Sequence, residues 1–477
     1  MGSGAFGRRG AHPDVHFLAV LARSMGRFYM AETMGERLAG VWARTDRIFE
    51  MLAPEAFLAQ PIALRHPFIF YVGHLPAFAW NHVCGGVLAR PSFNAAFDEL
   101  FSRGIDPDVD DPSHCHAHSE IPDRWPAVAE VLAYRDRVRA SVFESVDAVT
   151  ERAGTHVMAR DGRVFSMVIE HELMHQETLL YMLQELALDR KVRPAWLPRD
   201  VTGRGRPPAT VQVPPGTATL GAALTDLAFG WDNEFPPAQV FVPGFRMDET
   251  PVTNGQFLAF VDDGGYRRRE LWADDDWGWS REETLSHPRV WTNQDGRWLY
   301  RGLFDLLPFE RVKDWPVYVS LAEARAYARW RGLRLPTEAE FHRAAFGDPV
   351  GPERAFPWGA GAPGERHGNF DFRHWAPTPV GTYPEGASAW GVYDLVGNGW
   401  EWTETPFTGF PGFEAWIPGY PGYSADFFDG KHFVLKGGSW ATAAELVRRS
   451  FRNWFQAHYS YVFATFRCVA GAEVRAR

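Results

Sequence analysis

The texture of this 477-residue sequence changes near residue 198, and that change limits the fold more than any other feature. Before it, long amphipathic or apolar stretches predict helices over residues 18–52, 68–88, 127–149 and 164–188. After it, short apolar runs are cut by Pro and Gly, and we expect helices only over residues 321–331 and 337–345. The sequence therefore predicts the α+β class, with a helical bundle followed by a domain that has little regular secondary structure.

Length and composition indicate two domains and small-molecule partners. The chain is too long for one ordinary core, so we expect a bundle over 1–200 and a second domain over 209–477. Its net charge of −10 argues against binding to nucleic acid or to an anionic membrane. Only three cysteines occur, without a paired spacing, and no apolar run is long enough to span a bilayer. We therefore expect a cytoplasmic protein without a disulfide framework.

The segment His171-Glu172-Leu173-Met174-His175 lies inside a predicted helix and puts two imidazoles four residues apart on one face. Such a pair is a ready metal chelate. The segment also matches the zinc protease pattern, in which Glu172 would be the general base, and two histidines can equally be satisfied inside a bundle. His74, on an earlier apolar helix, is a further imidazole that needs a partner when buried, and a metal ion is a suitable one.

Five motifs occur in order in the second half: Glu249-Thr250-Pro251-Val252-Thr253-Asn254, Leu333-Arg334-Leu335-Pro336-Thr337-Glu338-Ala339-Glu340-Phe341, Gly397-Asn398-Gly399-Trp400-Glu401-Trp402-Thr403, Gly437-Gly438-Ser439-Trp440 and Phe466-Arg467. They resemble the formylglycine-generating enzyme (sulfatase-modifying factor) fold, which implies a C-type-lectin-like domain. A true formylglycine-generating enzyme holds copper with a cysteine pair near its C-terminus. Only Cys468 lies in this domain, so that activity is not expected, and a non-catalytic ligand-binding module is one alternative.

The whole chain resembles the sulfoxide synthases of ergothioneine, ovothiol and selenoneine biosynthesis, which combine a DinB-like helical bundle with such a domain. The Gly73-His74 helix and the later His-x-x-x-His-x-Glu helix carry this resemblance. It implies that His74, His171 and His175 hold a non-haem iron(II), the expected cofactor, with open positions for a thiolate, an imidazole and dioxygen. Three helix carboxylates are candidates to orient the imidazole N–H groups or to form the domain interface: Glu170, Glu172 and Glu177.

The same resemblance assigns site residues in the second domain. The family covers the iron with a loop, here about residues 406–436, whose tyrosine donates to the oxygen species; Tyr420 is the expected residue and Tyr423 the near alternative. Further on, Asn453-Trp454-Phe455 resembles an element in which the Asn bonds the imidazole substrate and the aromatic rings flank it. Aromatic faces suit a trimethylammonium group through cation–π attraction.

Departures from the family pattern leave the cosubstrate open. Met174, a substrate-binding candidate, stands where relatives that use γ-glutamylcysteine carry a Gln that touches the substrate. The arginine pair that clamps the glutamyl carboxylate in those relatives has no obvious match in the acidic, His-rich region 104–118. Within that region, His114-Cys115-His116-Ala117-His118 could bind a soft metal, but its spacing is not that of a known chelate. Segments 65–74 and 428–432 look closer to ovothiol synthases.

The sequence thus predicts an iron(II)- and O2-dependent oxidoreductase, a sulfoxide synthase of ergothioneine biosynthesis that joins the imidazole of hercynine to a cysteine-type thiol. The alternatives are an ovothiol-type 5-histidylcysteine sulfoxide synthase, which uses histidine, and a selenoneine synthase, which forms a C–Se bond with a selenosugar. Cysteine and γ-glutamylcysteine both stay open as donors. The rivals from other classes are a zinc protease, which needs no upstream Gly-His helix, and a binding module, which needs no third imidazole.

Overall fold

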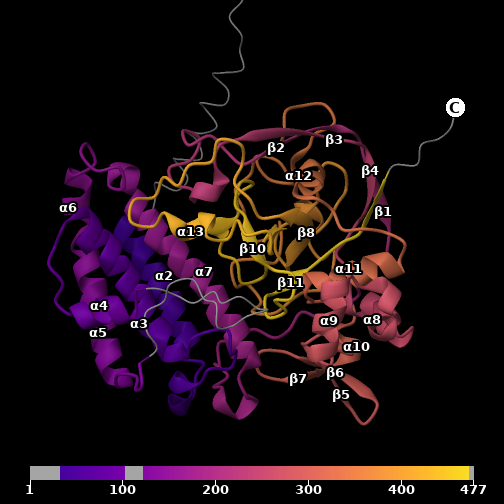
Figure 1. The fold of residues 1–477 in the computed structure, drawn as a ribbon, viewed down its shortest axis with the longest axis horizontal. Coiled ribbons are helices and arrows are strands. Elements are labelled where there is room, and N and C mark those ends of the chain that lie inside the picture. Colours follow the sequence, from indigo (N-terminus) through magenta and orange to yellow (C-terminus); the bar gives the residue numbers. More distant parts are fainter. Residues whose placement is uncertain (1–32, 103–121, 472–477) are drawn as a thin grey trace, which may run out of the picture.

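The computed structural model describes residues 33–102 and 122–471, and its helices and strands divide along the chain as the sequence predicts. The N-terminal part is helical, whereas the C-terminal part mixes short strands with short helices (Figure 1). The predicted α+β class is confirmed. Part of the helix predicted over 18–52 lies outside the described residues, as does the whole His114-Cys115-His116-Ala117-His118 segment.

Six α-helices form the bundle among the described residues: α2 (Met34–Phe49), α3 (Phe68–Ala79), α4 (Ala95–Leu100), α5 (Val128–Phe143), α6 (Val146–Glu151) and α7 (Arg163–Glu185). A capping box between Thr33 and Glu36 starts α2. The single helix predicted over 127–149 is divided between α5 and α6. The break falls at Ser145, whose hydroxyl donates to the carbonyl of Ser141 and so competes with regular helical bonding. Helix α3 packs on α5, and α2 packs on α7.

Helix α3 is buried along its whole length, which its almost entirely apolar sequence allows. Pro76 lies inside it, and a proline has no N–H to donate to the helical ladder. From Trp80 the helix continues as a π-helical segment, Trp80–Val87, instead of the regular helix predicted to residue 88. Such π-helical turns often occur at functional sites. This segment carries His82 toward the cavity described below.

Four small sheets occur in the second domain among the described residues. Their strands are β1 (Thr210–Val213), β4 (Phe245–Asp248) and β12 (Val469–Gly471); β10 (Asn453–Gln456), β9 (His432–Lys436), β8 (Trp400–Pro406) and β11 (Ala464–Thr465); β2 (Gly216–Leu220) and β3 (Ala238–Val242); and β5 (Trp291–Gln294), β6 (Arg297–Arg301) and β7 (Leu306–Pro308). Strand β11 runs parallel to β8, and β8, β9 and β10 pair antiparallel. This sheet positions the site, because residues 407–431, here named the tyrosine loop, connect β8 to β9.

The helices predicted over 321–331 and 337–345 are α11 (Leu321–Trp330) and α12 (Glu338–Phe346). The structure adds four more: α8 (Asn254–Asp262), α9 (Asp274–Glu282), α10 (Phe309–Val312) and α13 (Gly422–Ala425). The sequence carried a start signal for α8, since Thr253 and Gln256 form a capping box. It also carried one for α9, whose first turn holds three aspartates. The missed helices are short, so their apolar pattern is weak.

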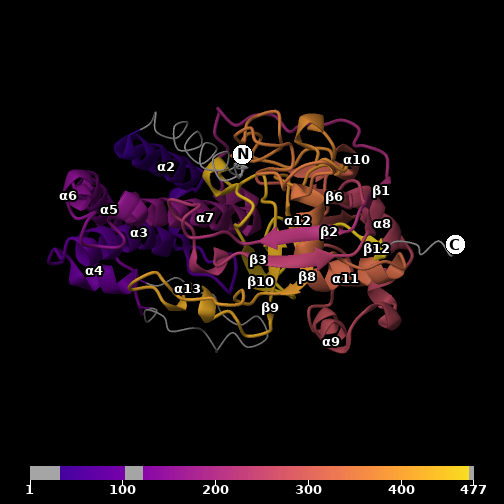
Figure 2. The ribbon, with the colours of Figure 1, turned by 90° about the horizontal axis from the view of Figure 1, so that it is seen from above.

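Helix α7 joins the two parts of the molecule. It runs between the bundle and the second domain, and α13 reaches across to the bundle (Figure 2). The buried carboxylate of Glu177 on α7 accepts hydrogen bonds from Trp400 Nε1 at 2.8 Å and from the hydroxyls of Ser439 at 2.5 Å and Thr442 at 3.1 Å. One hydrophobic cluster contains residues from both parts. The bundle and the second domain therefore share a continuous core.

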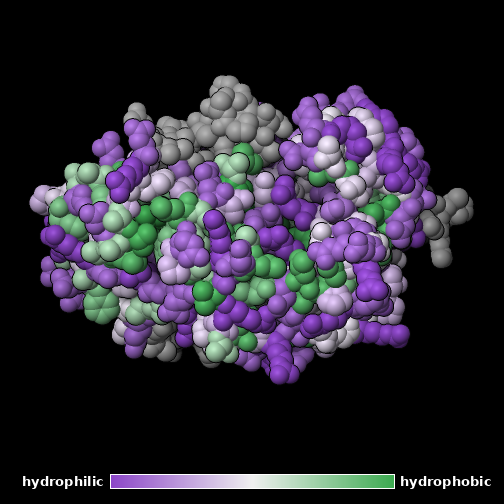
Figure 3. Space-filling view, turned by 90° about the horizontal axis from the view of Figure 1, so that it is seen from below, coloured by the Kyte–Doolittle hydropathy of each residue, from purple (hydrophilic) through white to green (hydrophobic). Residues whose placement is uncertain are grey.

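The surface of the molecule is mixed in character. Figure 3 shows one face, on which hydrophobic side chains gather in separate patches between hydrophilic ones. In the described part of the chain, no helix combines the length and the hydropathy that crossing a membrane requires.

Gly73 offers a test of the packing around α3. A Cβ atom at Gly73 would lie 2.5 Å from the fully buried ring of Phe101. We expect Gly73→Ala to lower the free energy of unfolding by about 1–3 kcal/mol, the usual effect of overpacking a core. Gly40→Ala on α2 is the matched control, because a Cβ there meets nothing within 4 Å. The control should raise stability by about 0.5–1 kcal/mol. Urea unfolding measures both variants, and equal stability of the two would contradict this packing.

Candidate metal centre

Three histidines from two helices converge at one point of the bundle. His74 lies on α3, and His171 and His175 lie one turn apart on α7. The Nε2 atoms of His74 and His175 are 3.3 Å apart, and the three ring centroids lie 4.5–5.0 Å from one another. One nitrogen from each ring lies within 4.8 Å of the other two. This grouping suits three ligands on one face of a metal ion.

The environment holds these imidazoles neutral. Burial lowers the pKa of His74 to about 4. Burial, and then the charge of neighbouring groups, lowers the pKa of His171 and of His175 well below the usual value. The carbonyl oxygen of Phe101 lies 2.8 Å from Nδ1 of His74, and because a carbonyl can only accept, this nitrogen carries the proton. The Nε2 of His74 therefore presents a lone pair to the centre, as a metal ligand must.

Aromatic packing fixes the direction of the second ligand. The ring of Phe78 stacks on the imidazole of His171 with centroids 3.6 Å apart and an interplanar angle of 5°. Among the described residues, Nδ1 of His171 and Nδ1 of His175 have no hydrogen-bond partner. Three neutral imidazoles that converge in this way are a donor set that fits a divalent metal ion. The two Nε2 atoms that face each other at 3.3 Å need either a proton or a cation between them.

The three candidate glutamates of α7 bind groups other than the imidazoles. Glu172 accepts a hydrogen bond from the Thr45 hydroxyl of α2 at 2.6 Å and lies 3.7 Å from Arg139, so its carboxylate faces the bundle. Glu170 and Glu177 both bind side chains of the second domain. The zinc-protease hypothesis needs Glu172 as a general base beside the metal, and this orientation argues against it. Glu170 and Glu177 lie at the domain interface, one of the two places expected for them.

The cluster opens into a cavity of about 920 Å³ between the bundle and the second domain. Helices α3 and α7 and the π-helical segment form one wall, and the tyrosine loop and β10 form the other. The remaining predicted site residues all line this cavity: Met174, Tyr420, Tyr423, Asn453, Trp454 and Phe455. The structure therefore brings every predicted site residue to one cavity, although the residues come from segments far apart in the chain.

Both candidate tyrosines line the cavity from the tyrosine loop. The hydroxyl of Tyr423 lies 3.6 Å from the sulfur of Met174, and its ring stacks on Trp231 with centroids 4.0 Å apart. Burial raises the pKa of Tyr423 well above its usual value, so this hydroxyl stays protonated. The ring of Tyr420 lies 5.7 Å from that of Phe78, the residue that stacks on a cluster histidine. The choice between the two tyrosines stays a prediction.

Aromatic rings also surround Trp454 on β10. Its ring stacks on Phe407 with centroids 4.2 Å apart, and the rings of Tyr423 and Phe427 lie 5.4 Å and 5.7 Å away. Three of these four residues line the cavity. Clustered aromatic faces attract a cationic group such as a quaternary ammonium.

His82 and Arg65 are two of the cavity-lining residues that sequence reasoning missed. The ring of His82 lies 6.0 Å from that of Tyr420, and burial lowers the pKa of His82 to about 4. Its spacing of eight residues from His74, about two helical turns, was an available signal. Arg65 also lines the cavity and donates from Nε to the hydroxyl of Tyr459 at 2.8 Å. A single cation in an otherwise apolar segment was the signal there.

Comparison with known proteins gives matches along nearly the whole chain. Residues 198–472 match the protein family described as "Sulfatase-modifying factor enzyme 1-like domain", and residues 37–179 match the family described as "DinB superfamily". The chain is 40% identical over 392 residues to "Hercynine oxygenase" of Mycolicibacterium thermoresistibile, which covers 80% of this chain and 82% of that protein. It is 31% identical over 536 residues to "Ergothioneine biosynthesis protein 1" of Neurospora crassa, covering 95% of this chain and 60% of that protein.

Among solved structures, PvdO from Pseudomonas aeruginosa is similar to this chain at 20% sequence identity, with a TM-score of 0.36. The match covers 55% of this chain and 93% of PvdO.

Removal of one imidazole should abolish tight metal binding by the cluster. We expect His74→Ala, loaded anaerobically with iron(II) or with zinc and then desalted, to lose most of its metal, because only two ligands remain. His82→Ala is the matched control, since this histidine lines the same cavity but lies outside the cluster. It should keep the metal content of the unchanged protein. Elemental analysis measures both, and full occupancy in His74→Ala would remove that residue from the site.

Proposed function

Because this chain belongs to the hercynine oxygenase family, we propose that it is an iron(II)- and O2-dependent sulfoxide synthase that joins a thiol to the imidazole ring of hercynine. One observation carries the proposal: three neutral imidazoles converge at a cavity large enough for two small substrates. We assign the iron to His74, His171 and His175. The metal ligands then come from the proposed domain over 1–200. The cavity wall opposite them comes from the proposed domain over 209–477.

The proposed reaction uses one O2 for each coupled product. One oxygen atom enters the sulfoxide, and the other leaves as water with the hydrogens of the thiol and of the imidazole C–H. The sulfur and the carbon together give up four electrons, which reduce the O2. The competing reaction is thiol dioxygenation, in which both oxygen atoms end on the sulfur as a sulfinic acid. The protein therefore has to favour C–S coupling over a reaction that consumes the same amount of O2.

Iron(II) held by three imidazoles would supply open coordination positions and would pass electrons from the substrates to O2. The cavity walls hold the thiol and the imidazole side by side, which removes much of the entropic barrier to coupling. We propose that the side chain of Asn453 bonds the imidazole of hercynine. The rings of Trp454 and Phe455 flank this substrate and attract its trimethylammonium group. Met174 contacts the substrates from α7, and Tyr420 supplies a proton at the oxygen atom that leaves as water.

Oxygen uptake tests the proposed function against a zinc protease. We expect the iron(II)-loaded protein to consume O2 only when an imidazole substrate and a thiol are both present. Hercynine and histidine are tested in turn with cysteine, γ-glutamylcysteine and a selenosugar, and mass spectrometry identifies the product. Glu172→Gln should keep this activity, because the carboxylate faces Thr45 and not the cluster. Peptide hydrolysis by the zinc-loaded protein, lost in Glu172→Gln and without O2 uptake by the iron form, would reverse the assignment.

Substitution of each tyrosine tests the proton donor. Tyr420→Phe keeps the ring and should keep iron and substrate binding, while the missing hydroxyl diverts the reaction from coupling toward the sulfinic acid. The ratio of coupled product to sulfinic acid at equal O2 consumption is the measurement. Tyr423→Phe is the matched control, because it removes a hydroxyl from the same wall of the cavity. A changed ratio only in Tyr423→Phe would assign the role to that tyrosine, and no change in either would place the donor elsewhere.

A further inference from the structure

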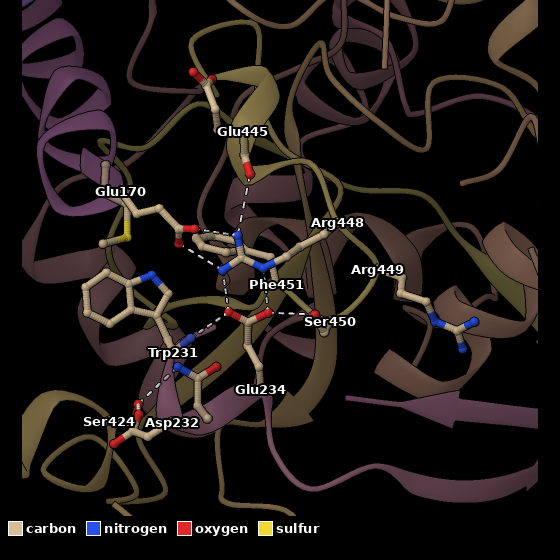
Figure 4. A network of polar contacts seen from close by, with 12 residues as sticks. Glu170, Trp231, Asp232, Glu234, Ser424, Glu445, Arg448, Arg449, Ser450 and Phe451 are labelled. Carbon is tan, nitrogen blue, oxygen red and sulfur yellow. Dashed lines mark hydrogen bonds and ion pairs between the residues drawn. The ribbon is translucent and has the colours of Figure 1, made fainter. Parts of the chain in front are cut away.

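A buried ion network joins the metal-binding helix to the second domain. Arg448 donates from Nη1 and Nη2 to the two carboxylate oxygens of Glu170, each at 2.9 Å, and from Nε to Glu234 at 2.8 Å (Figure 4). Glu234 also accepts from the hydroxyl of Ser450 at 2.6 Å. Glu170 is the residue immediately before His171, so one end of the network lies beside a proposed metal ligand.

The other end of the network lies in the tyrosine loop. Glu234 belongs to the single turn Asp232–Glu234, which holds α13 through two contacts. The hydroxyl of Ser424 donates to the carboxylate of Asp232 and accepts from Nδ2 of Asn233 at 3.0 Å. Ser424 directly follows Tyr423, whose ring stacks on the residue before this turn. A chain of polar contacts therefore runs from beside the metal cluster to beside the cavity tyrosines.

The members of this network are too deeply buried for their contacts to be incidental. Glu170 is 7% exposed, and Glu234, Asp232 and Ser424 are fully buried. A buried charge that loses its partner strongly destabilises a protein, so the carboxylates favour the arrangement in which Arg448 lies between them. The tyrosine loop has little regular structure of its own, with α13 as a helix of only four residues. Its position therefore depends on such side-chain contacts.

We infer that this network, from Glu170 through Arg448 and Glu234 to Asp232 and Ser424, positions the tyrosine loop against the metal-binding helix and thereby sets the partition between C–S coupling and thiol dioxygenation. The inference rests on the proposed function and adds positioning residues that touch neither the metal nor the substrates. A proton donor has to reach the reacting oxygen in one geometry, whereas dioxygenation requires no such donor. A displacement of about 1 Å can change the rate of a positioned step by roughly 100-fold.

The mildest test removes one hydroxyl. In Ser424→Ala we expect iron content and the KM for the thiol to stay unchanged, because the histidine cluster and α7 are untouched. The ratio of coupled product to sulfinic acid should fall about tenfold, the effect expected for one lost hydrogen bond to a charged group. Asp371→Asn is the matched control, since Arg44 and Asp371 form another ion pair between bundle and second domain, at 3.2 Å, with no member in the network. It should leave the ratio unchanged.

A double-mutant cycle asks whether the two ends act as one unit. Glu170→Gln alone should lower the same ratio, and Ser424→Ala added to it should change the ratio little further, because both changes interrupt one path. Fully additive effects would overturn the inference. So would an unchanged ratio in Ser424→Ala, or an equal fall in Asp371→Asn, which would indicate a general loosening of the interface.

A second readout needs neither metal nor turnover. Hydrogen exchange measured by mass spectrometry on the metal-free protein should show faster exchange in residues 407–431 of Ser424→Ala, with α7 unchanged. Unchanged exchange in this loop would refute the positioning role even if the product ratio shifted. If the unchanged protein couples no substrate pair at all, the proposed function fails, and the exchange experiment still decides whether the network holds the loop.

Discussion

Helix α7 carries polar side chains in several directions although most of it is buried, and each buried polar group has to find a partner inside the protein. Successive residues of a helix point about 100° apart, so Glu170, His171 and Glu172 face three different neighbours. Glu170 binds an arginine of the second domain, His171 belongs to the histidine cluster, and Glu172 accepts a hydrogen bond from the hydroxyl of Thr45. Glu177, close to two turns after Glu170, bonds to the second domain again. The contacts of these glutamates therefore fix the position of α7, the helix that carries two of the imidazoles.

The sequence could predict the histidine cluster because much of its geometry is local. A spacing of four residues places His171 and His175 on one face of any helix, and the apolar neighbours of His74 indicate that it is buried. The same spacing also allowed a zinc protease with Glu172 as the base. The two hypotheses differ in the direction of that carboxylate, which is set by a hydroxyl 127 residues away. No local pattern contains this information.

The rest of the site could be predicted only by resemblance or not at all. The tyrosine loop has no periodic pattern, and its position depends on contacts such as Ser424 to Asp232, which lie 192 residues apart. The pair of Glu170 and Arg448 spans 278 residues. Patterns of period 2 or 3.6 report which face of an element is buried, but not which distant charge it meets. Helix α8 is different, because its capping box was visible in the sequence and only its short length hid it.

The division of the site between two domains follows from the chemistry proposed for it. A metal that has to accept two substrates and O2 can take only part of its ligands from the protein, so the bundle supplies three imidazoles and leaves the other side open. Residues that face this open side have to come from another part of the chain, here β10 and the tyrosine loop. These residues can position the substrates only if β10 and the tyrosine loop keep a fixed position relative to the metal. Glu170 and Glu177 make the contacts that hold the second domain in this position. Both lie on α7, the helix that carries two of the three proposed ligands. We therefore expect a change in domain docking to reach the proposed metal centre through the same helix.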